Sequence, residues 1–324
     1  MRRSSSAAVA AVAIVVGAGA VAAALSIIDG PVTVGRQAVR VTPPGPSLGG
    51  CPMFPADNAW NSDISRLPLH PRSGAIIAKI QADGGDYLHP DFGENPEYGI
   101  PYVVVPATQP EVPITYTRYG DESDPGPFPI PLDAPIEGDG AGDSHVLVLR
   151  QGTCELFELY VGRRSGPGWA ADSGARFDLE SNDLRPLGWT SADAAGLPIL
   201  PGLVRYDEVA AGVIRHAIRV TFSETQRGYI LPATHFASDS TDPDRPPMGL
   251  RLRLGASYDV SQLTGQARMI AVAMQQYGLI VADNGSNWFF QGAPSPNWDD
   301  DDLNQLKEIA GSAFEVVDTG VIQS

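Results

Sequence analysis

The sequence predicts a mainly β fold, an antiparallel two-sheet sandwich of the jelly-roll type with a few appended helices. Three observations support this prediction. Short β-branched or alternating apolar runs outnumber helical patterns. The 35 glycines and 29 prolines are spread between these runs, as expected for strands joined by many turns. The helical patterns interrupt the strands irregularly, without the strand–helix alternation that is typical of a parallel sheet.

The first 28 residues have the order of an export segment. Met1-Arg2-Arg3 is basic, and residues 7–28 contain no charged side chain. This order is typical of a secretory signal peptide, and 22 uncharged residues could also cross a membrane as a retained anchor. Both alternatives place the rest of the chain outside the cytoplasm, in the extracellular space or at the cell surface. Contact with a membrane is expected only through this segment.

The remaining chain is predicted to contain one domain. Residues 29–50 are rich in proline and glycine and are interpreted as a linker. Residues 51–324 contain neither an internal repeat nor a break in composition, which indicates a single β-rich globular domain. The chain has only two cysteines, Cys51 and Cys154. In an exported protein this pair predicts one disulfide bond, which would close a loop of about 100 residues.

The predicted elements follow from local patterns along this domain. Isoleucines on one face predict a helix over residues 73–82, and an amphipathic pattern that ends at Gly278 predicts another over 264–277. A third helix begins near Asp299, where a run of four aspartates suits the positive end of a helix. Strands are expected over residues 102–105, 145–149, 154–160, 213–222, 228–232, 250–254, 278–282 and 288–290. Residues 120–142 form a long, acidic, proline-rich loop.

The clearest local prediction is a β-hairpin over residues 145–160. The four residues 150–153 include a glycine and have a common hairpin-loop length. In the expected register, His145 faces Glu158 at one end of an otherwise apolar sheet face. We therefore expect an imidazole and a carboxyl group to lie side by side there.

Charge and motifs exclude several classes of function. The formal net charge of −16 repels phosphate backbones, so nucleic-acid binding is not expected. The chain has no P-loop, no dinucleotide-binding glycine motif, no zinc-protease motif and no serine-hydrolase elbow. No cofactor is therefore predicted, and the acidic surface favours a neutral or cationic partner.

Histidines and carboxylates gather on the predicted strands. Of five histidines, three lie among apolar strand residues, each with a carboxylate near in sequence or in pairing: His145, His216 and His235. Glycoside hydrolysis needs two carboxyl groups, for which we select Glu158 and Asp207. In a polysaccharide lyase, His216 with Tyr206 or Arg219 could instead supply the base and a cation. The alternative is a purely structural role, in which these histidines are hydrogen-bonded core residues.

Four residues are predicted to contact the substrate. Tryptophans in turn-like segments can stack against sugar rings or plug the ends of a sandwich, and Trp189 is the one selected here. Arg205 and Tyr206 flank the candidate Asp207, and Asp283 lies at an Asp-Asn-Gly turn after a strand. A polysaccharide or other glycan is the expected partner.

Four stretches resemble a family of uncharacterised exported bacterial proteins with relatives in fungi. They are residues 51–60 (CPMFPADNAW), 89–93 (HPDFG), 190–209 (TSADAAGLPILPGLVRYDEV) and 282–285 (ADNG). The resemblance covers most of the chain after Cys51 and implies one continuous domain. It implies no activity and no site residues.

The sequence thus favours an extracellular carbohydrate-active enzyme, a glycoside hydrolase or a polysaccharide lyase with a carboxylate–histidine site. Two alternatives stay open. The protein could be a non-catalytic carbohydrate-binding or cell-surface module. It could also be a cupin-like metal-dependent enzyme, because three histidines and a carboxylate form the ligand set of many metal sites, although no metal-binding residue is assigned.

Overall fold

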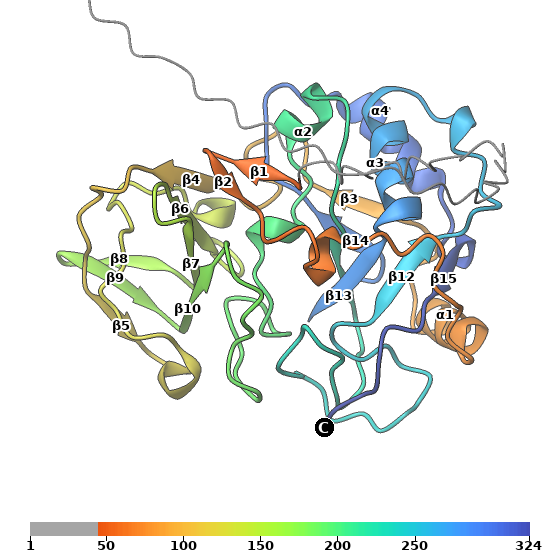
Figure 1. Cartoon of the computed structure of the whole chain (residues 1–324), viewed down its shortest axis with the longest axis horizontal. Helices are drawn as coiled ribbons and strands as arrows, with labels where there is room; N and C mark the ends of the chain where they lie inside the picture. Colours follow the sequence, from red (N-terminus) through yellow and green to blue (C-terminus); the bar gives the residue numbers. More distant parts are fainter. Residues whose placement is uncertain (1–44) are drawn as a thin grey trace, which may run out of the picture. The chain divides into compact units, whose positions relative to one another are not determined.

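The computed structural model describes residues 45–324 (Figure 1). The predicted export segment and residues 29–44 of the predicted linker lie outside the described residues. Within residues 45–324 no helix is long and apolar enough to cross a membrane. The last residues of the predicted linker belong to a small hairpin, β1 (Ser47–Leu48) with β2 (Cys51–Pro52). Ordered structure therefore begins before Cys51.

The larger sheet has six strands in the order β15-β12-β13-β11-β14-β3. Their bounds are β3 (His89–Asp91), β11 (Ile218–Phe222), β12 (Arg251–Leu254), β13 (Leu279–Asn284), β14 (Phe289–Gln291) and β15 (Phe314–Val316). β11 and β13 pair in parallel, as do β14 and β3, and the other pairs are antiparallel. The carboxyl ends of the central strands β11 and β13 therefore lie at the same edge, and this edge carries the site described below.

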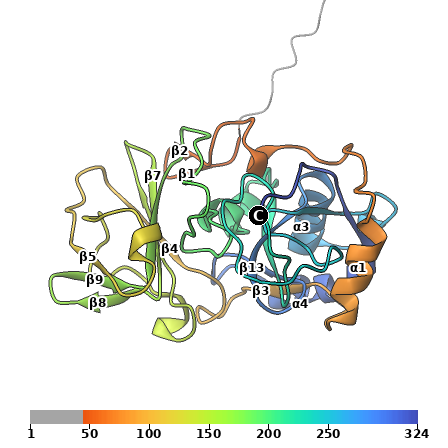
Figure 2. The same cartoon turned by 90° about the horizontal axis from the view of Figure 1, so that it is seen from below.

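The second sheet has four strands in the order β10-β7-β6-β4. Its strands are β4 (Tyr102–Val105), β6 (Val146–Arg150), β7 (Glu155–Tyr160) and β10 (Ser173–Asp178). A three-stranded sheet, β5 (Ile114–Tyr116), β9 (Gly168–Ala171) and β8 (Arg163–Ser165), lies beside it in both views (Figures 1 and 2). The prediction of a strand-rich fold with few helices is confirmed.

The expected antiparallel jelly-roll is not confirmed, because the sheets are mixed. Four strand pairs are parallel: β11–β13, β14–β3, β4–β6 and β5–β9. Parallel pairs need long connections, and the chain provides them. About 40 residues separate β4 from β6, and the path from β11 to β13 includes β12 and a helix. These long excursions are irregular in sequence, which is why local patterns did not reveal them.

The four-stranded sheet is buried on both faces. Leu147, Leu149 and Leu156 point into the main core, which also contains the central strands of the six-stranded sheet. On the other face, Val148 and other side chains pack against Trp169 of β9 in a second core. Burial on both faces explains the continuous apolar runs of β6 and β7.

In the described part of the chain, four α-helices accompany the sheets: α1 (Ser73–Ala82), α2 (Tyr206–Ala210), α3 (Gly265–Gln276) and α4 (Asp300–Asn304). Short 3-10 helices occupy Ala59–Asn61, Gly120–Glu122, Glu137–Gly140, Leu200–Gly202, Val260–Gln262, Gln305–Glu308 and Gly311–Ala313. The aspartate run at α4 has structural partners. The Asp299 side chain accepts the Asp302 N–H, and Asp302 in turn accepts the N–H groups of Gln266 and Ala267 at the start of α3.

Most predicted elements exist, with shifted ends. The predicted helix over 73–82 coincides with α1, and the strand over 102–105 with β4. Only the second half of the predicted strand 213–222 is a strand, β11. Residues 228–232 form no strand, although Tyr229 makes isolated β-bridges. Strands β8 to β10 were not predicted, because glycines and arginines interrupt their apolar alternation.

The predicted disulfide is present between Cys51 and Cys154, whose Cα atoms are 5.3 Å apart. It joins the hairpin β1–β2 to the turn between β6 and β7. Such a bond fits an extracellular protein, since reducing compartments rarely preserve disulfides.

The predicted β6–β7 hairpin is present, but its register differs from the expected one. Leu147 pairs with Glu158 and Arg150 with Glu155, so His145 does not face Glu158 directly. The physical reason lies at Cys154, whose φ of 51° places it in the turn and delays the start of β7 to Glu155. Because the register moves by two residues, His145 and Glu158 still share one face of the sheet.

Candidate functional site

Two adjoining cavities form a cleft at the carboxyl edge of β11 and β13. The larger has a volume of about 410 Å³ and the smaller about 230 Å³. Both are lined by Asp143, Asp283 and Asn284, so they meet at these residues. The larger cavity is further lined by Tyr119, Glu122, Tyr160 and His235, and the smaller by Asp91, Glu137, His145, Arg219 and Gln291.

A β-bulge places Asp283 at the junction of the cavities. Val220 pairs with Val281, but the next pair is Thr221 with Asp283, so Ala282 is an extra residue in β13. A bulge of this kind redirects the following side chain. The carbonyl of Ala282 accepts the N–H of Ala195, which anchors the segment carrying Asp193 next to β13.

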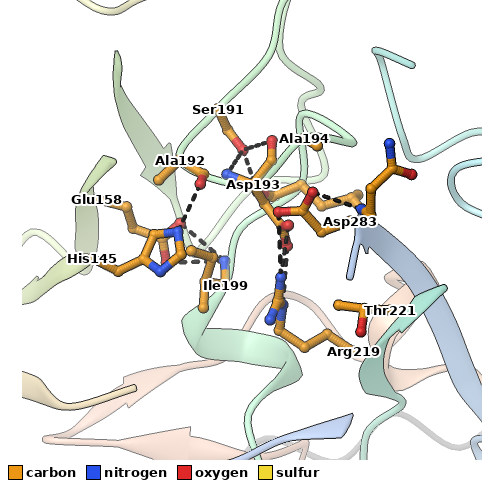
Figure 3. A network of polar contacts seen from close by, with 12 residues as sticks. His145, Glu158, Ser191, Ala192, Asp193, Ala194, Ile199, Arg219, Thr221 and Asp283 are labelled. Carbon is orange, nitrogen blue, oxygen red and sulfur yellow. Dashed lines mark hydrogen bonds and ion pairs between the residues drawn. The ribbon is translucent and has the colours of Figure 1, made fainter. Parts of the chain in front are cut away.

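A buried ion pair lies directly behind Asp283. Arg219 of β11 donates from Nε to Asp193 Oδ2 at 3.1 Å and from Nη2 to Oδ1 at 2.8 Å (Figure 3). The same Nη2 is 3.9 Å from Asp283 Oδ2. Both Asp193 and Arg219 are buried. Two parallel hydrogen bonds fix the orientation of both groups, so Asp193 presents a fixed negative charge to Asp283.

Asp283 is held as a neutral acid at the cleft surface. Burial, and then the negative charge of Asp193, raise its pKa to about 8, while Arg219 acts in the opposite direction. Its side chain keeps 23% of its surface exposed, so it can reach a bound molecule. At neutral pH the structure therefore offers a proton donor at the point where the cavities meet.

His145 is a buried cation beside the smaller cavity. Its Nδ1 is 2.5 Å from Glu137 Oε2, and its Nε2 is 3.1 Å from the carbonyl oxygen of Ala192. Both neighbours are hydrogen-bond acceptors, so both ring nitrogens carry a proton. Burial lowers the pKa of His145, but the hydrogen bond and charge of Glu137 outweigh burial and raise it to about 9.

Glu158 lies beneath the cleft and lines neither cavity. It is fully buried, and its carboxyl oxygens accept the N–H group of Ile199 at 2.9–3.0 Å (Figure 3). Its Oε1 also accepts the N–H group of Leu200 at 2.9 Å. Burial raises the pKa of Glu158 to about 7, despite these two amides. Glu158 therefore holds the segment that follows Asp193 in place, and it cannot contact a substrate directly.

His235 lies at the rim of the larger cavity. Its Nδ1 donates to the carbonyl oxygen of Ala194 at 2.8 Å, and its Nε2 is 4.0 Å from Glu122 Oε2. About a quarter of the side chain is exposed. Nε2 is thus the ring atom available to a bound molecule.

The structure brings three of the predicted site residues together in the cleft, namely His145, His235 and Asp283, with Glu158 beneath them. It does not bring Glu158 and Asp207 into one site. Asp207 lies on α2, where its carboxylate is 3.4 Å from Arg205 Nε, and it lines a different cavity with Tyr206. The predicted carboxylate pair is therefore corrected.

The second group of predicted residues forms its own ionic cluster. Arg205 Nη2 is 2.8 Å from Glu208 Oε1, and His216 Nε2 is 2.9 Å from Glu208 Oε2. His216 Nδ1 also contacts the carbonyl oxygen of Ala217 at 2.8 Å. All three side chains are buried, which agrees with a purely structural role for His216 as a hydrogen-bonded core residue. Trp189 lines neither cavity of the cleft and packs beneath the guanidinium of Arg185.

Three charged residues of the cleft were not selected from the sequence: Glu137, Asp143 and Asp193. Glu137 belongs to the long acidic loop, and Asp143 directly follows this loop. The length of the loop could indicate a function, but not which of its residues line a site. Asp193 precedes a Gly-Leu-Pro segment that resembles a loop, and nothing local indicates that it is buried. Arg219 was predicted only as a cation beside His216, but the structure pairs it with Asp193 and pairs His216 with Glu208.

Metal ligation finds no support in the described part of the chain. Residues 45–324 contain no group of three or more histidine, cysteine, aspartate or glutamate side chains arranged to hold a metal ion. The three histidines selected from the sequence bind separate partners, Glu137, Glu208 and Ala194. The cupin-like alternative therefore has no ligand set here.

Comparison of the chain with protein-family models, with curated proteins and with solved structures finds no match. The function is therefore argued from the geometry of the cleft. Its distinguishing features are a neutral carboxyl group, a buried ion pair behind it and an excess of carboxylates along the walls.

Proposed function

We propose that the protein is an extracellular carbohydrate-active enzyme, a glycoside hydrolase that works by general acid–base catalysis in the cleft. The single observation that carries this proposal is Asp283, a solvent-accessible carboxyl group whose pKa of about 8 keeps it protonated at neutral pH. Cleavage of a glycosidic bond requires such an acid to protonate the leaving oxygen. The ion pair of Asp193 with Arg219 supplies the fixed charge that maintains this state.

Asp143 is the proposed partner carboxylate. It lines both cavities together with Asp283, and it is exposed. In the proposed reaction the bond between the anomeric carbon and the glycosidic oxygen breaks, and Asp283 gives its proton to that oxygen. A water molecule supplies the hydroxyl group that bonds to the anomeric carbon, and Asp143 accepts the proton of that water. Solvent exchange then returns a proton to Asp283 and removes one from Asp143.

The charge of the cleft favours hydrolysis over lyase chemistry. A lyase acts on a sugar acid and needs a cation to neutralise the substrate carboxylate. The guanidinium of Arg219 already forms two hydrogen bonds with the carboxylate of Asp193, and the imidazolium of His145 is paired with Glu137. Neither cation is therefore free to neutralise a substrate carboxylate. Carboxylates such as Glu122 and Asp143 would repel an anionic sugar. This distribution supports a neutral or cationic glycan as the substrate.

A non-catalytic carbohydrate-binding module is the second candidate. Tyr119 and Tyr160 line the larger cavity, and aromatic rings of this kind bind sugars without any reaction. A binding module would not need a carboxyl group with a displaced pKa at the centre of its site, and perturbed carboxyls are concentrated in active sites. The presence of Asp283 therefore favours catalysis.

The test is a screen of soluble polysaccharides for release of reducing ends by the wild-type protein, Asp283→Asn and Asp143→Asn. Asp133→Asn is the matched control, because Asp133 is exposed and lines neither cavity. We expect each cleft variant to lose about 10²- to 10⁴-fold in rate, and the control to keep full activity. Equal rates for wild-type protein and Asp283→Asn would refute the proposed acid. Sugar binding without cleavage by the wild-type protein would support the binding module.

A further inference from the structure

We infer that the cleft accepts the interior of a glycan chain that carries free amino groups, so that the enzyme cleaves within the polymer. This inference rests on the proposed function and specifies its substrate. It combines two observations, the arrangement of the cavities around Asp283 and the unpaired negative charge on their walls.

The cleft continues beyond Asp283 in two directions. The larger cavity reaches Tyr119, Glu122 and His235, and the smaller reaches Asp91, Ser286 and Gln291. Within residues 45–324, only Asp143, Asp283 and Asn284 line both cavities. The proposed acid therefore lies between two binding spaces, as required when sugar units must occupy both sides of the bond that breaks. A site built for chain ends would close on one side of the acid.

The walls carry more negative charge than their own cations balance. Of the carboxylates lining the cleft, Asp193 is paired with Arg219 and Glu137 with His145. Asp143 has no cationic side chain within 4.0 Å among the described residues. The Glu122 carboxylate accepts the Thr190 N–H at 3.0 Å, and within residues 45–324 its one ion-pair partner is His235, at 4.0 Å. Arg185 Nη2 lies nearby but donates to the backbone carbonyl of Glu122, at 2.9 Å.

Ammonium groups on the substrate would supply the positive charge that these two carboxylates, Glu122 and Asp143, lack. Glu122 and Asp143 both line the larger cavity, together with Tyr119 and Tyr160. Carboxylates form charge-assisted hydrogen bonds with an ammonium group, and tyrosine faces attract cations. A neutral N-acetylated sugar can donate its amide N–H to a carboxylate, but it brings no positive charge to pair with the carboxylate or with a tyrosine face. The net charge of −16 adds a long-range attraction for a polycation.

Binding is measured first, on the full-length protein with Asp283→Asn to prevent turnover. The probes are glucosamine oligomers of two to six units and their N-acetylated counterparts, titrated by calorimetry at two salt concentrations. We expect free amines to bind about tenfold or more tightly, because an ammonium group adds ionic attraction to the hydrogen bonds that both kinds of oligomer can form. We also expect affinity to rise with length beyond two units and to fall with salt.

Adding Glu122→Gln should remove most of the preference for amines, since the amide keeps an acceptor for the Thr190 N–H but loses the charge. Glu97→Gln is the matched control, because Glu97 is exposed and lies outside both cavities. Equal affinity for amine and N-acetylated oligomers would overturn the inference about charge. Equal loss of preference in both variants would overturn the role of Glu122.

Cleavage within the chain is measured on partly deacetylated chitin with the wild-type protein. We expect viscosity to fall at least several-fold before a few per cent of the bonds are broken. Release of only monomers or dimers from the start would overturn cleavage within the chain and leave the proposed hydrolase standing. No cleavage of any glycan, with amine oligomers still bound by Asp283→Asn, would refute the hydrolase and leave the amine preference standing.

Discussion

Asp283→Asn should make the protein more stable than wild type at alkaline pH. The aspartate has a folded-state pKa of about 8 against a reference value of 3.8. Between these values the folded state binds a proton that the unfolded state has lost, so wild-type stability falls as pH rises through this window. Asparagine has nearly the same shape and never ionises, so this loss is absent from the variant.

The size of the effect follows from the displacement of the pKa. Each pH unit corresponds to about 1.36 kcal/mol, which gives an upper value of roughly 6 kcal/mol between pH 4 and pH 9. The side chain keeps 23% of its surface in solvent, and screening by water reduces the expected effect to roughly 2–4 kcal/mol. Glu158 titrates in the same window, but it is present in both proteins and cancels in the comparison.

The assay is urea unfolding followed by fluorescence at pH 4, 5, 6, 7, 8 and 9. The free energy of unfolding of the wild-type protein is subtracted from that of Asp283→Asn at each pH. Asp133→Asn serves as the control, since its exposed side chain has no partner to lose. We expect the difference for Asp283→Asn to grow from pH 4 to about pH 8 and then to level off, and the control to stay within about 0.5 kcal/mol of wild type.

Parallel pH profiles for the wild-type protein and Asp283→Asn would show that Asp283 titrates as an ordinary carboxyl group. In that case it would be ionised at neutral pH and could not act as a proton donor. The proposed mechanism would then lose its acid, whatever activity the protein has.

Three further results are expected. Replacing Cys51 and Cys154 by alanine should cost about 4–5 kcal/mol, because the bond closes a loop with a sequence separation of 103, and reductant should then have no effect on the variant's unfolding curve. Asp193→Leu should cost about 3–5 kcal/mol by leaving Arg219 buried without its charge partner, whereas the double variant Asp193→Leu, Arg219→Met should recover most of this loss. Urea unfolding of the two single variants and the double variant measures the coupling, and a double variant no more stable than Asp193→Leu would contradict it. Asp302→Ala should cost about 1–2 kcal/mol, because this carboxylate accepts backbone N–H groups at the start of α3, and an unchanged melting temperature would contradict this role.

The β6–β7 hairpin shows where local pattern succeeds and where it stops. Alternating apolar residues predicted both strands and the shared face of His145 and Glu158. The pattern could not predict the register, because Cys154 is apolar enough to continue a strand. Its disulfide with Cys51, a residue about 100 positions away, instead accompanies a turn conformation at this residue.

The candidate site was predicted only in part, for a related reason. His145, His235 and Asp283 are recognisable as polar residues at strand ends, and the structure places them together. Asp207 and His216 have the same local appearance, yet they belong to the separate cluster around Glu208. Sequence spacing does not show which strand ends meet, because that depends on the parallel pairing of β11 with β13 and on the segments that cross between them.

The sequence by itself determined that this chain is rich in strands and acidic, with one disulfide and with polar groups at the ends of apolar runs. These properties depend on single residues and their near neighbours. The tertiary structure alone decided that Asp283 is a neutral acid. Its pKa depends on Asp193 and Arg219, which are 90 and 64 positions away along the chain. It also depends on the extra residue Ala282, which turns the carboxyl group towards the cleft. Electrostatic interactions act through space, so they emerge only when distant segments are packed together.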